Sequence, residues 1–300
     1  MGWGDWGLLV ALSVLWGGSF PAYRELAHQH LPPIVTVAGR LVLGAAFVAA
    51  LFRLQGIDLR IARRDWPRLL AFGLLNNVLP YTLFAWAEQR IDGGTAAILN
   101  ATTPIFTLLV TGLLLRTERL TANRVVGIFC GFVGVAVLVG PEALLGQDVW
   151  GQLACVSAAI LYGFALPFGR TLSHLGPQRL AVGQLTAASV VAVPLMLALD
   201  PPWTVPPLDA AGWMALLSIG LLSTGLAFVL FFRILLPAGA TNLSLVTLLV
   251  PVSALLFGAI LLAEPVGLRA LAGMATTGLG LACIDGRLFK LGRKRSVEVA

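Results

Sequence analysis

Residues 33–52 read PIVTVAGRLVLGAAFVAALF, a stretch of 20 residues whose single charge is on Arg40. An α-helix rises about 1.5 Å per residue, so a helix of this length crosses the hydrocarbon core of a bilayer, which is about 30 Å thick. Apolar residues do not alternate with polar ones here, which favours a helix over a strand of a membrane barrel. Residues 33–52 are therefore a predicted transmembrane helix.

The rest of the 300-residue chain repeats this pattern, because 58% of its residues are hydrophobic and only 11% are charged. Ten windows are long and apolar enough to span a membrane: 7–24, 33–52, 69–88, 94–115, 123–140, 150–169, 180–199, 211–232, 239–262 and 268–285. The connectors between them are short, which leaves almost no room for an extramembrane domain. The sequence predicts an all-α integral membrane protein with ten transmembrane helices.

The basic residues predict how these helices are oriented. Alternate connectors and the C-terminal tail hold 16 of the 20 Lys and Arg residues, namely Arg53, Arg60, Arg63, Arg64, Arg68, Arg116, Arg119, Arg124, Arg170, Arg179, Arg233, Arg287, Lys290, Arg293, Lys294 and Arg295. The opposite side receives only Arg24, Arg90 and Arg269. Basic residues concentrate in cytoplasmic loops, so we expect both termini in the cytoplasm. The net charge of +6 then faces anionic lipid at the inner membrane surface rather than nucleic acid.

The two halves of the chain resemble each other at a shift of about 146 residues. The matching segments are Leu15-Trp16-Gly17, Pro21 and Arg24 with Leu161-Tyr162-Gly163, Pro167 and Arg170; Gly39-Arg40-Leu41 with Gly183-Gln184-Leu185; and Pro104 with Pro251. We expect one five-helix repeat in residues 1–145, a second in residues 146–286, and a basic cytoplasmic tail in residues 287–300. Five is an odd number, so the repeats insert with opposite orientations. Inverted repeats are typical of secondary transporters, whose substrate sites lie between them.

The Leu15-Trp16-Gly17 segment, the ten spans and the duplicated proline segment carry a family resemblance over nearly the whole chain. In these features the sequence resembles the drug/metabolite transporter superfamily, the EamA family in particular, and within it the aromatic amino-acid exporter branch. The resemblance implies two inverted five-helix repeats and export of amino acids or related metabolites. It also implies a bacterial plasma (inner) membrane.

Polar and aromatic side chains at membrane depth are the candidate substrate-binding residues. An ionisable group inside a span is costly and usually faces a cavity or a partner, which singles out Arg40. Trp16, Tyr81 and Asn100 fall at a similar depth, while Tyr162 and Gln184 mirror Trp16 and Arg40 in the second half. The full candidate set is Trp16, Arg40, Asn77, Tyr81, Phe84, Asn100, Tyr162 and Gln184. Hydrogen bonding between helices is the alternative role for such residues.

The chemistry of this set predicts the substrate class. Arginine pairs bidentately with a carboxylate, and aromatic side chains offer flat apolar surface. We therefore expect a substrate with a carboxylate and an aromatic or apolar body. Together with the family resemblance, which implies export, this predicts a secondary transporter that exports such amino acids or related carboxylates by alternating access through a central cavity. Glu88 lies near the surface end of its window, and no other carboxylate falls convincingly at the centre. Facilitated transport is the leading expectation, with a proton-coupled drug/metabolite antiporter as the alternative.

Glycine and proline residues predict packing and bending. The spacing of Gly127 with Gly131, and of Gly273 with Thr277 and Gly280, is typical of close helix packing, here between the repeats rather than between two copies of the chain. A monomer is therefore favoured over a dimer. The hinge candidates, which interrupt helices that need to bend, are Gly17, Gly18, Pro21, Pro104 and Pro251.

Other function classes lack their signatures. The sequence has no HExxH or GxSxG motif and no pair of buried carboxylates, so an intramembrane enzyme is disfavoured. It has no GxxxxGK[ST] loop, which disfavours ATP-driven pumping, and no cofactor or metal is expected. A channel is a further alternative, for which rings of like charge or a carbonyl filter would be typical.

Overall fold

The computed structural model describes residues 2–91, 93–140, 145, 148–261 and 267–285, and the regular structure in these ranges is helical. The predicted tail, 287–300, lies outside them. The α-helices are α1 (Trp3–Gly17), α2 (Ser19–His28), α3 (Pro33–Leu54), α4 (Trp66–Gly73), α5 (Leu79–Ala87), α6 (Gly93–Asn100), α7 (Thr103–Leu109), α8 (Ala122–Val139), α9 (Val149–Arg170), α10 (Gly176–Leu199), α11 (Ala210–Leu217), α12 (Ala227–Ala238), α13 (Ala240–Ser244), α14 (Val246–Leu261) and α15 (Leu268–Asp285). Short 3₁₀ helices, η1 (Arg63–Asp65), η5 (Ser173–Leu175) and η6 (Pro202–Thr204), lie in connectors.

Three wider, π-helical segments interrupt the α-helical spans. They are η2 (Leu74–Val78) between α4 and α5, η3 (Val110–Leu114) after α7, and η7 (Ser218–Leu226) between α11 and α12. The segments η2 and η7 fall in the third and eighth predicted spans, which are equivalent helices of the two predicted repeats. Such π-helical turns occur frequently at functional sites.

Consecutive helices combine into membrane spans. Within the described residues, nine helical stretches are long and apolar enough to cross a bilayer: Trp3–His28, Pro33–Leu54, Arg63–Ala87, Gly93–Leu114, Ala122–Val139, Val149–Arg170, Ser173–Leu199, Ala210–Ala238 and Ala240–Phe257. Each overlaps one of the first nine predicted windows. The tenth window coincides with α15, whose apolar part, Leu268–Ile284, is shorter. The count of ten spans therefore stays a prediction.

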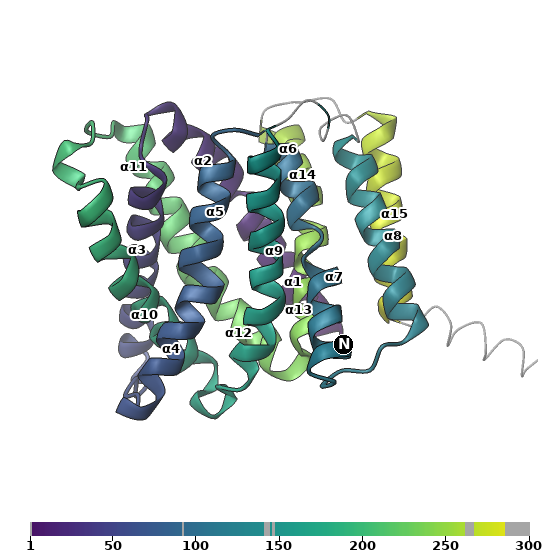
Figure 1. Cartoon of the computed structure of the whole chain (residues 1–300), viewed down its shortest axis with the longest axis horizontal. Helices are drawn as coiled ribbons and strands as arrows, with labels where there is room; N and C mark the ends of the chain where they lie inside the picture. Colours follow the sequence, from purple (N-terminus) through teal and green to yellow (C-terminus); the bar gives the residue numbers. More distant parts are fainter. Residues whose placement is uncertain (1, 92, 141–144, 146–147, 262–266, 286–300) are drawn as a thin grey trace, which may run out of the picture.

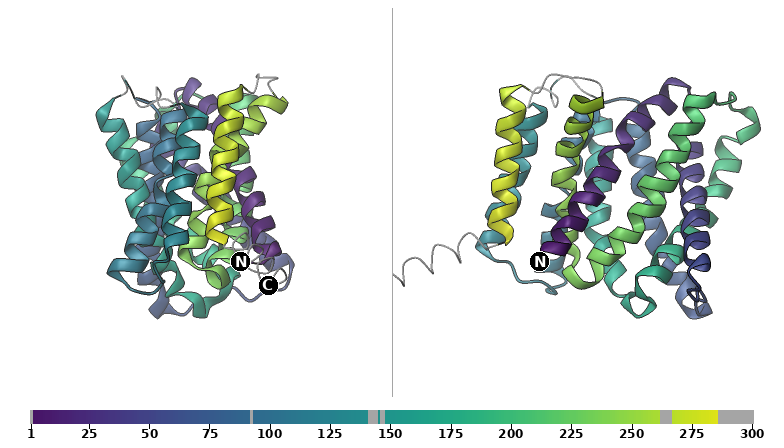
Figure 2. Two further views of the ribbon diagram at one scale, coloured as in Figure 1. Left: turned by 90° about the vertical axis from the view of Figure 1, so that its right-hand side faces the viewer. Right: turned by 180° about the vertical axis from the view of Figure 1, so that it is seen from behind.

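The spans form one bundle in which helices of the two halves are neighbours (Figures 1 and 2). Helix α3 packs against α10, α5 and α7 pack against α9, and α1 packs against α14. Helices α8 and α15 pair along one side of the bundle, teal and yellow in Figure 1. Helix α1 starts at the lower face in Figure 1 and α9 starts at the upper face, so these two helices run in opposite directions.

Glycines bring α8 and α15 into close contact. A Cβ added at Gly280 would lie 2.5 Å from Gly131 N and 2.6 Å from Gly127 O, and Gly134 packs as closely on Thr277. Small residues let the backbones of membrane helices approach, which gains van der Waals contact in the absence of a hydrophobic driving force. The prediction that these glycines pack the two halves against each other is confirmed.

Several contacts between the halves occur twice, with the partners exchanged. Gly17 of α1 packs on Ser253 of α14, and Gly163 of α9 packs on Phe106 of α7. The two glycines are 146 residues apart and their two partners are 147 residues apart. The same exchange relates the contacts Gly39–Leu216 and Gly183–Leu69. Equivalent residues of the two halves therefore hold equivalent helix pairs together.

Four of the five hinge candidates fall at two helix interruptions. Helix α1 ends at Gly17, Gly18 follows as its C-cap, and α2 begins at once with Pro21 in its first turn. Pro104 is in the first turn of α7, directly after the break that ends α6. Pro251 differs, because α14 runs through it and the break lies earlier, at Leu245 between α13 and α14.

Candidate functional site

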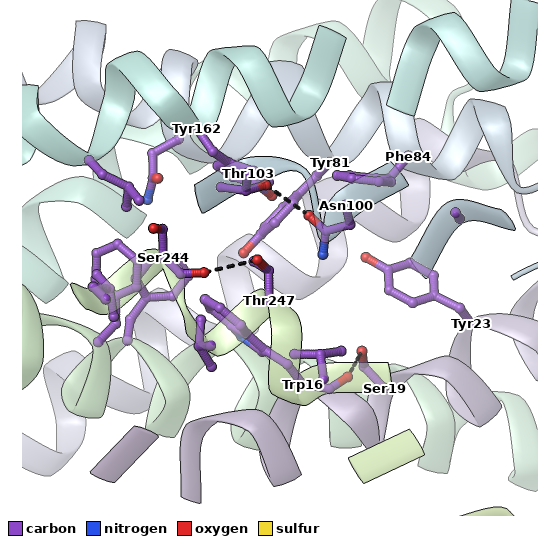
Figure 3. A pocket seen from close by; sticks show the side chains of 18 of the residues that line it. Trp16, Ser19, Tyr23, Tyr81, Phe84, Asn100, Thr103, Tyr162, Ser244 and Thr247 are labelled. Atoms are coloured by element: carbon purple, nitrogen blue, oxygen red, sulfur yellow. Dashed lines mark hydrogen bonds between the residues drawn. The ribbon is translucent and has the colours of Figure 1, made fainter. Parts of the chain in front are cut away.

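A pocket lies between helices of both halves (Figure 3), with an empty volume of about 900 Å³ counted out to its open side. Its lining comes from α1, α2, α3 and the segment from η2 to α7 in the first half, and from α9 and α12 to α14 in the second. The lining residues are Trp16, Ser19, Tyr23, Arg40, Asn76, Tyr81, Phe84, Glu88, Ala96, Asn100, Thr103, Tyr162, Leu166, Phe228, Phe231, Leu243, Ser244, Val246, Thr247 and Val250.

Arg40 of α3 is buried, with 4% of its surface exposed, and its guanidinium group reaches both halves of the chain. Its Nε donates to Oγ1 of Thr224 at 2.9 Å, and its Nη2 donates to the backbone oxygen of Ser223 at 3.5 Å, both in η7. Its Nη1 donates to the Tyr23 hydroxyl in α2. The guanidinium carbon lies 3.9 Å from the centre of the Tyr81 ring, a cation–π contact. Nη1 and Nη2 each keep a second hydrogen for a ligand.

Aromatic rings from both halves form the walls of the pocket. Trp16 of α1 lies 6.2 Å from Phe231 of α12, measured between ring centres, and its Nε1 donates to Ser223 O at 3.0 Å. Phe84 of α5 stacks on Tyr162 of α9, with ring centres 6.3 Å apart and 22° between the ring planes. Fixed aromatic surfaces of this kind fit a flat or apolar part of a ligand.

Polar side chains also face the pocket. In Figure 3, Tyr23, Tyr81, Asn100 and Thr247 point toward the inside of the pocket. Thr103 Oγ1 donates to Asn100 Oδ1 at 3.3 Å, so the amide nitrogen of Asn100 is turned to the pocket. The pocket therefore combines apolar walls with a few polar groups that can orient a small molecule.

Asn77 and Gln184 lie beside the pocket rather than in its lining. Both are fully buried, and Nε2 of Gln184 in α10 donates to Oδ1 of Asn77 in η2. Gln184 is 144 residues beyond Arg40, and Thr224 is 147 residues beyond Asn77. The hydrogen bond between Gln184 and Asn77 therefore joins the positions that match Arg40 and Thr224, but both of its partners are neutral.

Six of the eight predicted substrate-binding residues line the pocket: Trp16, Arg40, Tyr81, Phe84, Asn100 and Tyr162. Sequence reasoning missed Tyr23 and Asn76. Glu88, expected near the surface end of its span, follows the last residue of α5 and is partly exposed, and it also lines the pocket. The helix break at Gly18 carries Tyr23 to the pocket beside Arg40. The π-helical turn η2 changes which side of the span each residue faces, so Asn76 rather than Asn77 lines the cavity.

Asn76 is a polar group that the protein leaves unsatisfied. It is 2% exposed, and neither atom of its amide has a hydrogen-bond partner among the described residues. A buried group without a partner costs about 1–3 kcal/mol, so Asn76 is suited to a bound ligand or water.

The exposure of the lining is graded from one end to the other. Ser19, Tyr23 and Glu88, near α2 and the end of α5, are partly exposed, whereas Leu243 and Ser244 of α13 are buried. Near the buried end, Phe72 and Phe168 lie 6.1 Å apart between ring centres, as do Phe72 and Phe232. Access to the pocket in this conformation is therefore from the end formed by α2 and α5.

A comparison with protein-family models finds a match over residues 3–140 and again over residues 149–284, in both cases to the EamA-like transporter family. The chain belongs to the EamA-like transporter family. The two matched stretches together cover nearly all of this transporter, including each helix that contributes to the pocket.

Several relatives of this EamA-like transporter are named as transporters or exporters. An uncharacterized transporter of Archaeoglobus fulgidus is 27% identical over 92% of this chain and 96% of its own length. The uncharacterized inner membrane transporter YedA of Escherichia coli K12 is 29% identical over 84% of this chain and 81% of its own length. A probable terminal-alkyne amino-acid exporter of Streptantibioticus cattleyicolor is 27% identical, over 98% and 96%. A solved crystal structure shares the fold, with a TM-score of 0.76 at 19% identity over 94% of this chain and 97% of that one.

Family and relatives agree with the apolar helices on the general class. This protein is a multi-pass membrane transporter of small molecules. The same names indicate transport rather than catalysis.

Proposed function

We propose that this transporter exports small metabolites with a carboxylate and an aromatic or apolar body, amino acids above all, by alternating access of the pocket between its halves. The observation that carries the proposal is Arg40, a buried cation held over the Tyr81 ring in a pocket with aromatic walls. The relative in Streptantibioticus cattleyicolor, named as a probable amino-acid exporter, supports the same substrate class.

Each part of the substrate has a counterpart in the lining. The free hydrogens on Nη1 and Nη2 of Arg40 bind the carboxylate, because a guanidinium group pairs with a carboxylate through parallel hydrogen bonds. The rings of Trp16, Tyr81, Phe84 and Tyr162 contact the apolar body.

The proposal includes an architecture of two inverted five-helix repeats, residues 1–145 and 146–286, with both termini cytoplasmic in a bacterial inner membrane. The opposite directions of α1 and α9 and the exchanged contacts between the halves support the inverted repeat. The breaks at Gly17–Gly18 and before Pro104 then act as hinges when the pocket changes the side to which it opens. The name of the Escherichia coli relative supports the location.

Flux into liposomes that contain the purified protein tests the function. We expect saturable uptake of radiolabelled phenylalanine that unlabelled phenylalanine competes, as a carrier requires and a channel does not. Arg40→Gln is expected to fold normally and to lose at least tenfold in transport of phenylalanine, with a smaller loss for phenylalanine amide. Arg40→Lys is expected to restore transport only in part, because the ammonium group lacks the planar fork.

Arg90→Gln is the matched control for this experiment. Arg90 lies outside the pocket lining, with its guanidinium group 3.8 Å from the centre of the Trp86 ring, so its loss should leave the flux unchanged. Equal transport of acid and amide by a well-folded Arg40→Gln protein, at the wild-type rate, would remove Arg40 from the substrate site.

Proton-coupled antiport is the second candidate, and the position of Glu88 in the pocket lining favours it. A carboxylate in a pocket is the kind of group that carries protons in coupled carriers. A pH gradient across the same liposomes separates the two candidates. A facilitated carrier only equilibrates the substrate, whereas an antiporter accumulates it against its concentration gradient.

A further inference from the structure

Glu88 is a pocket carboxylate that forms no ion pair within 4.0 Å among the described residues. It follows the last residue of α5, is partly exposed, and belongs to the pocket lining. Within the described residues, the ion pairs closer than 4.0 Å involve other acidic groups, Asp58, Asp65 and Glu118. Arg90 is near in sequence, yet its Nη1 donates to the Trp86 backbone oxygen at 3.2 Å.

Arg40, the cation of the same pocket, likewise has no carboxylate within ion-pair distance in the described part of the chain. Arg40 is held by neutral acceptors, the Tyr23 hydroxyl, Thr224 Oγ1 and the Ser223 carbonyl oxygen. A charge surrounded by apolar walls is costly unless an opposite charge compensates it. The pocket thus offers one positive and one negative site that do not neutralise each other directly.

A zwitterion carries both of the charges that complement these two lining residues. Its carboxylate compensates Arg40, and its ammonium group compensates Glu88. The surroundings of Glu88 also favour a cation, because the negative end of the α5 dipole lies there. The ring of Phe84, one turn earlier in α5, adds an aromatic face that attracts an ammonium group.

We propose that Glu88 binds the ammonium group of the substrate and so makes the pocket selective for free amino acids over the same carboxylic acids without an amino group. This inference rests on the proposed function, in which Arg40 binds the carboxylate.

Competition experiments in liposomes test the role of Glu88. Uptake of labelled phenylalanine is inhibited with phenylalanine, with 3-phenylpropionate, which lacks the ammonium group, and with phenethylamine, which lacks the carboxylate. In the wild type we expect phenylalanine to inhibit best. In Glu88→Gln we expect the preference for phenylalanine over 3-phenylpropionate to fall at least tenfold, while the inhibition constant of 3-phenylpropionate stays within twofold. Glu25→Gln, the same change outside the pocket lining, should leave the preference intact.

Two outcomes overturn the assignment. One is a Glu88→Gln protein that prefers phenylalanine over 3-phenylpropionate as strongly as the wild type does. The other is loss of pH-gradient drive in Glu88→Gln with unchanged preference, which would make Glu88 a proton carrier only. Failure of the proposed function looks different, because the wild type itself would then transport no phenylalanine.

A measurement on the wild type covers the case in which Glu88→Gln does not fold. A hydrophobic carbodiimide modifies carboxyl groups within membrane proteins, and mass spectrometry quantifies the modification of Glu88. We expect phenylalanine and phenethylamine to protect Glu88 severalfold better than 3-phenylpropionate does. Equal protection by all three compounds would overturn the proposal.

Discussion

Arg40 and Gln184 occupy equivalent places in the two halves, and the difference between them shows what one residue contributes. The charge of Arg40 needs several acceptors and an aromatic ring, and its side chain reaches the pocket. The neutral amide of Gln184 donates through Nε2 to Asn77, its Oε1 has no hydrogen-bond partner among the described residues, and the side chain stays outside the lining. Such a buried neutral pair holds α10 to η2 only while both amides are present, because removal of one leaves the other unsatisfied.

A double-mutant cycle tests this at the residue scale. Gln184→Met and Asn77→Leu should each lower the free energy of unfolding by about 1–3 kcal/mol, since each leaves a buried amide without a partner. The double variant should lose clearly less than the sum, because both polar groups are then gone. Thermal unfolding in detergent measures the effect, and additive losses would show that the contact between the two amides contributes nothing.

Among the helices, the spans were predictable from sequence, and their interruptions were not. An apolar run of about 20 residues is a property of composition, so nine described spans overlap their predicted windows. Composition does not reveal the π-helical segments η2 and η7. The sequence SIGLLSTGL of η7, for example, is as apolar as that of a regular helix. Proline was only partly informative: Pro104 follows a break, whereas α14 continues through Pro251.

Because helix interruptions could not be predicted, only some of the residues that line the pocket could be predicted from the sequence. Depth along a span can be counted from the sequence, and it correctly brought Trp16, Arg40, Tyr81 and Asn100 together. The direction in which a residue faces depends on turns and breaks, and so Asn76 and Tyr23 were missed.

Two glycines of α15 test the packing of one helix pair. Gly280→Ala places a Cβ 2.5 Å from Gly131 N, backbone that cannot move aside, so we expect a loss of about 1–3 kcal/mol in stability. Gly278→Ala is the control on the same helix, because an added Cβ there meets nothing within 4 Å. Alanine favours the helix by up to about 1 kcal/mol over glycine, so the control should be neutral or stabilising. Equal thermal stability of the two variants would contradict close packing between α8 and α15.

For the whole molecule, the exchanged contacts place the two halves in one continuous interface. Helices of both halves line the same pocket, with α9 packed on α5 and α7 and α1 packed on α12 and α14. In the proposed alternating-access cycle, the pocket would open to the other side when the contacts of one half are exchanged for those of the other.

Cysteine labelling tests the orientation of the whole bundle. On a background in which Cys130, Cys155 and Cys283 are replaced by Ala, single cysteines are placed at the exposed residues Gln55 and Thr204. In intact cells a membrane-impermeant maleimide should label Thr204→Cys and should reach Gln55→Cys only after permeabilisation. The reverse pattern would invert the topology that the basic residues predict.

The hydrogen bonds of Arg40 to η7 join the two halves, and they have a kinetic consequence for the proposed cycle. When the halves move apart, an empty carrier loses these acceptors with nothing to compensate the guanidinium group, whereas in a loaded carrier the bound carboxylate still compensates it. We then expect the return of the unloaded protein to be the slow step of the proposed cycle, and cargo on the far side to accelerate it. Such a carrier would exchange one molecule for another faster than it releases a single one, and without cargo it would rarely change the side to which its pocket opens.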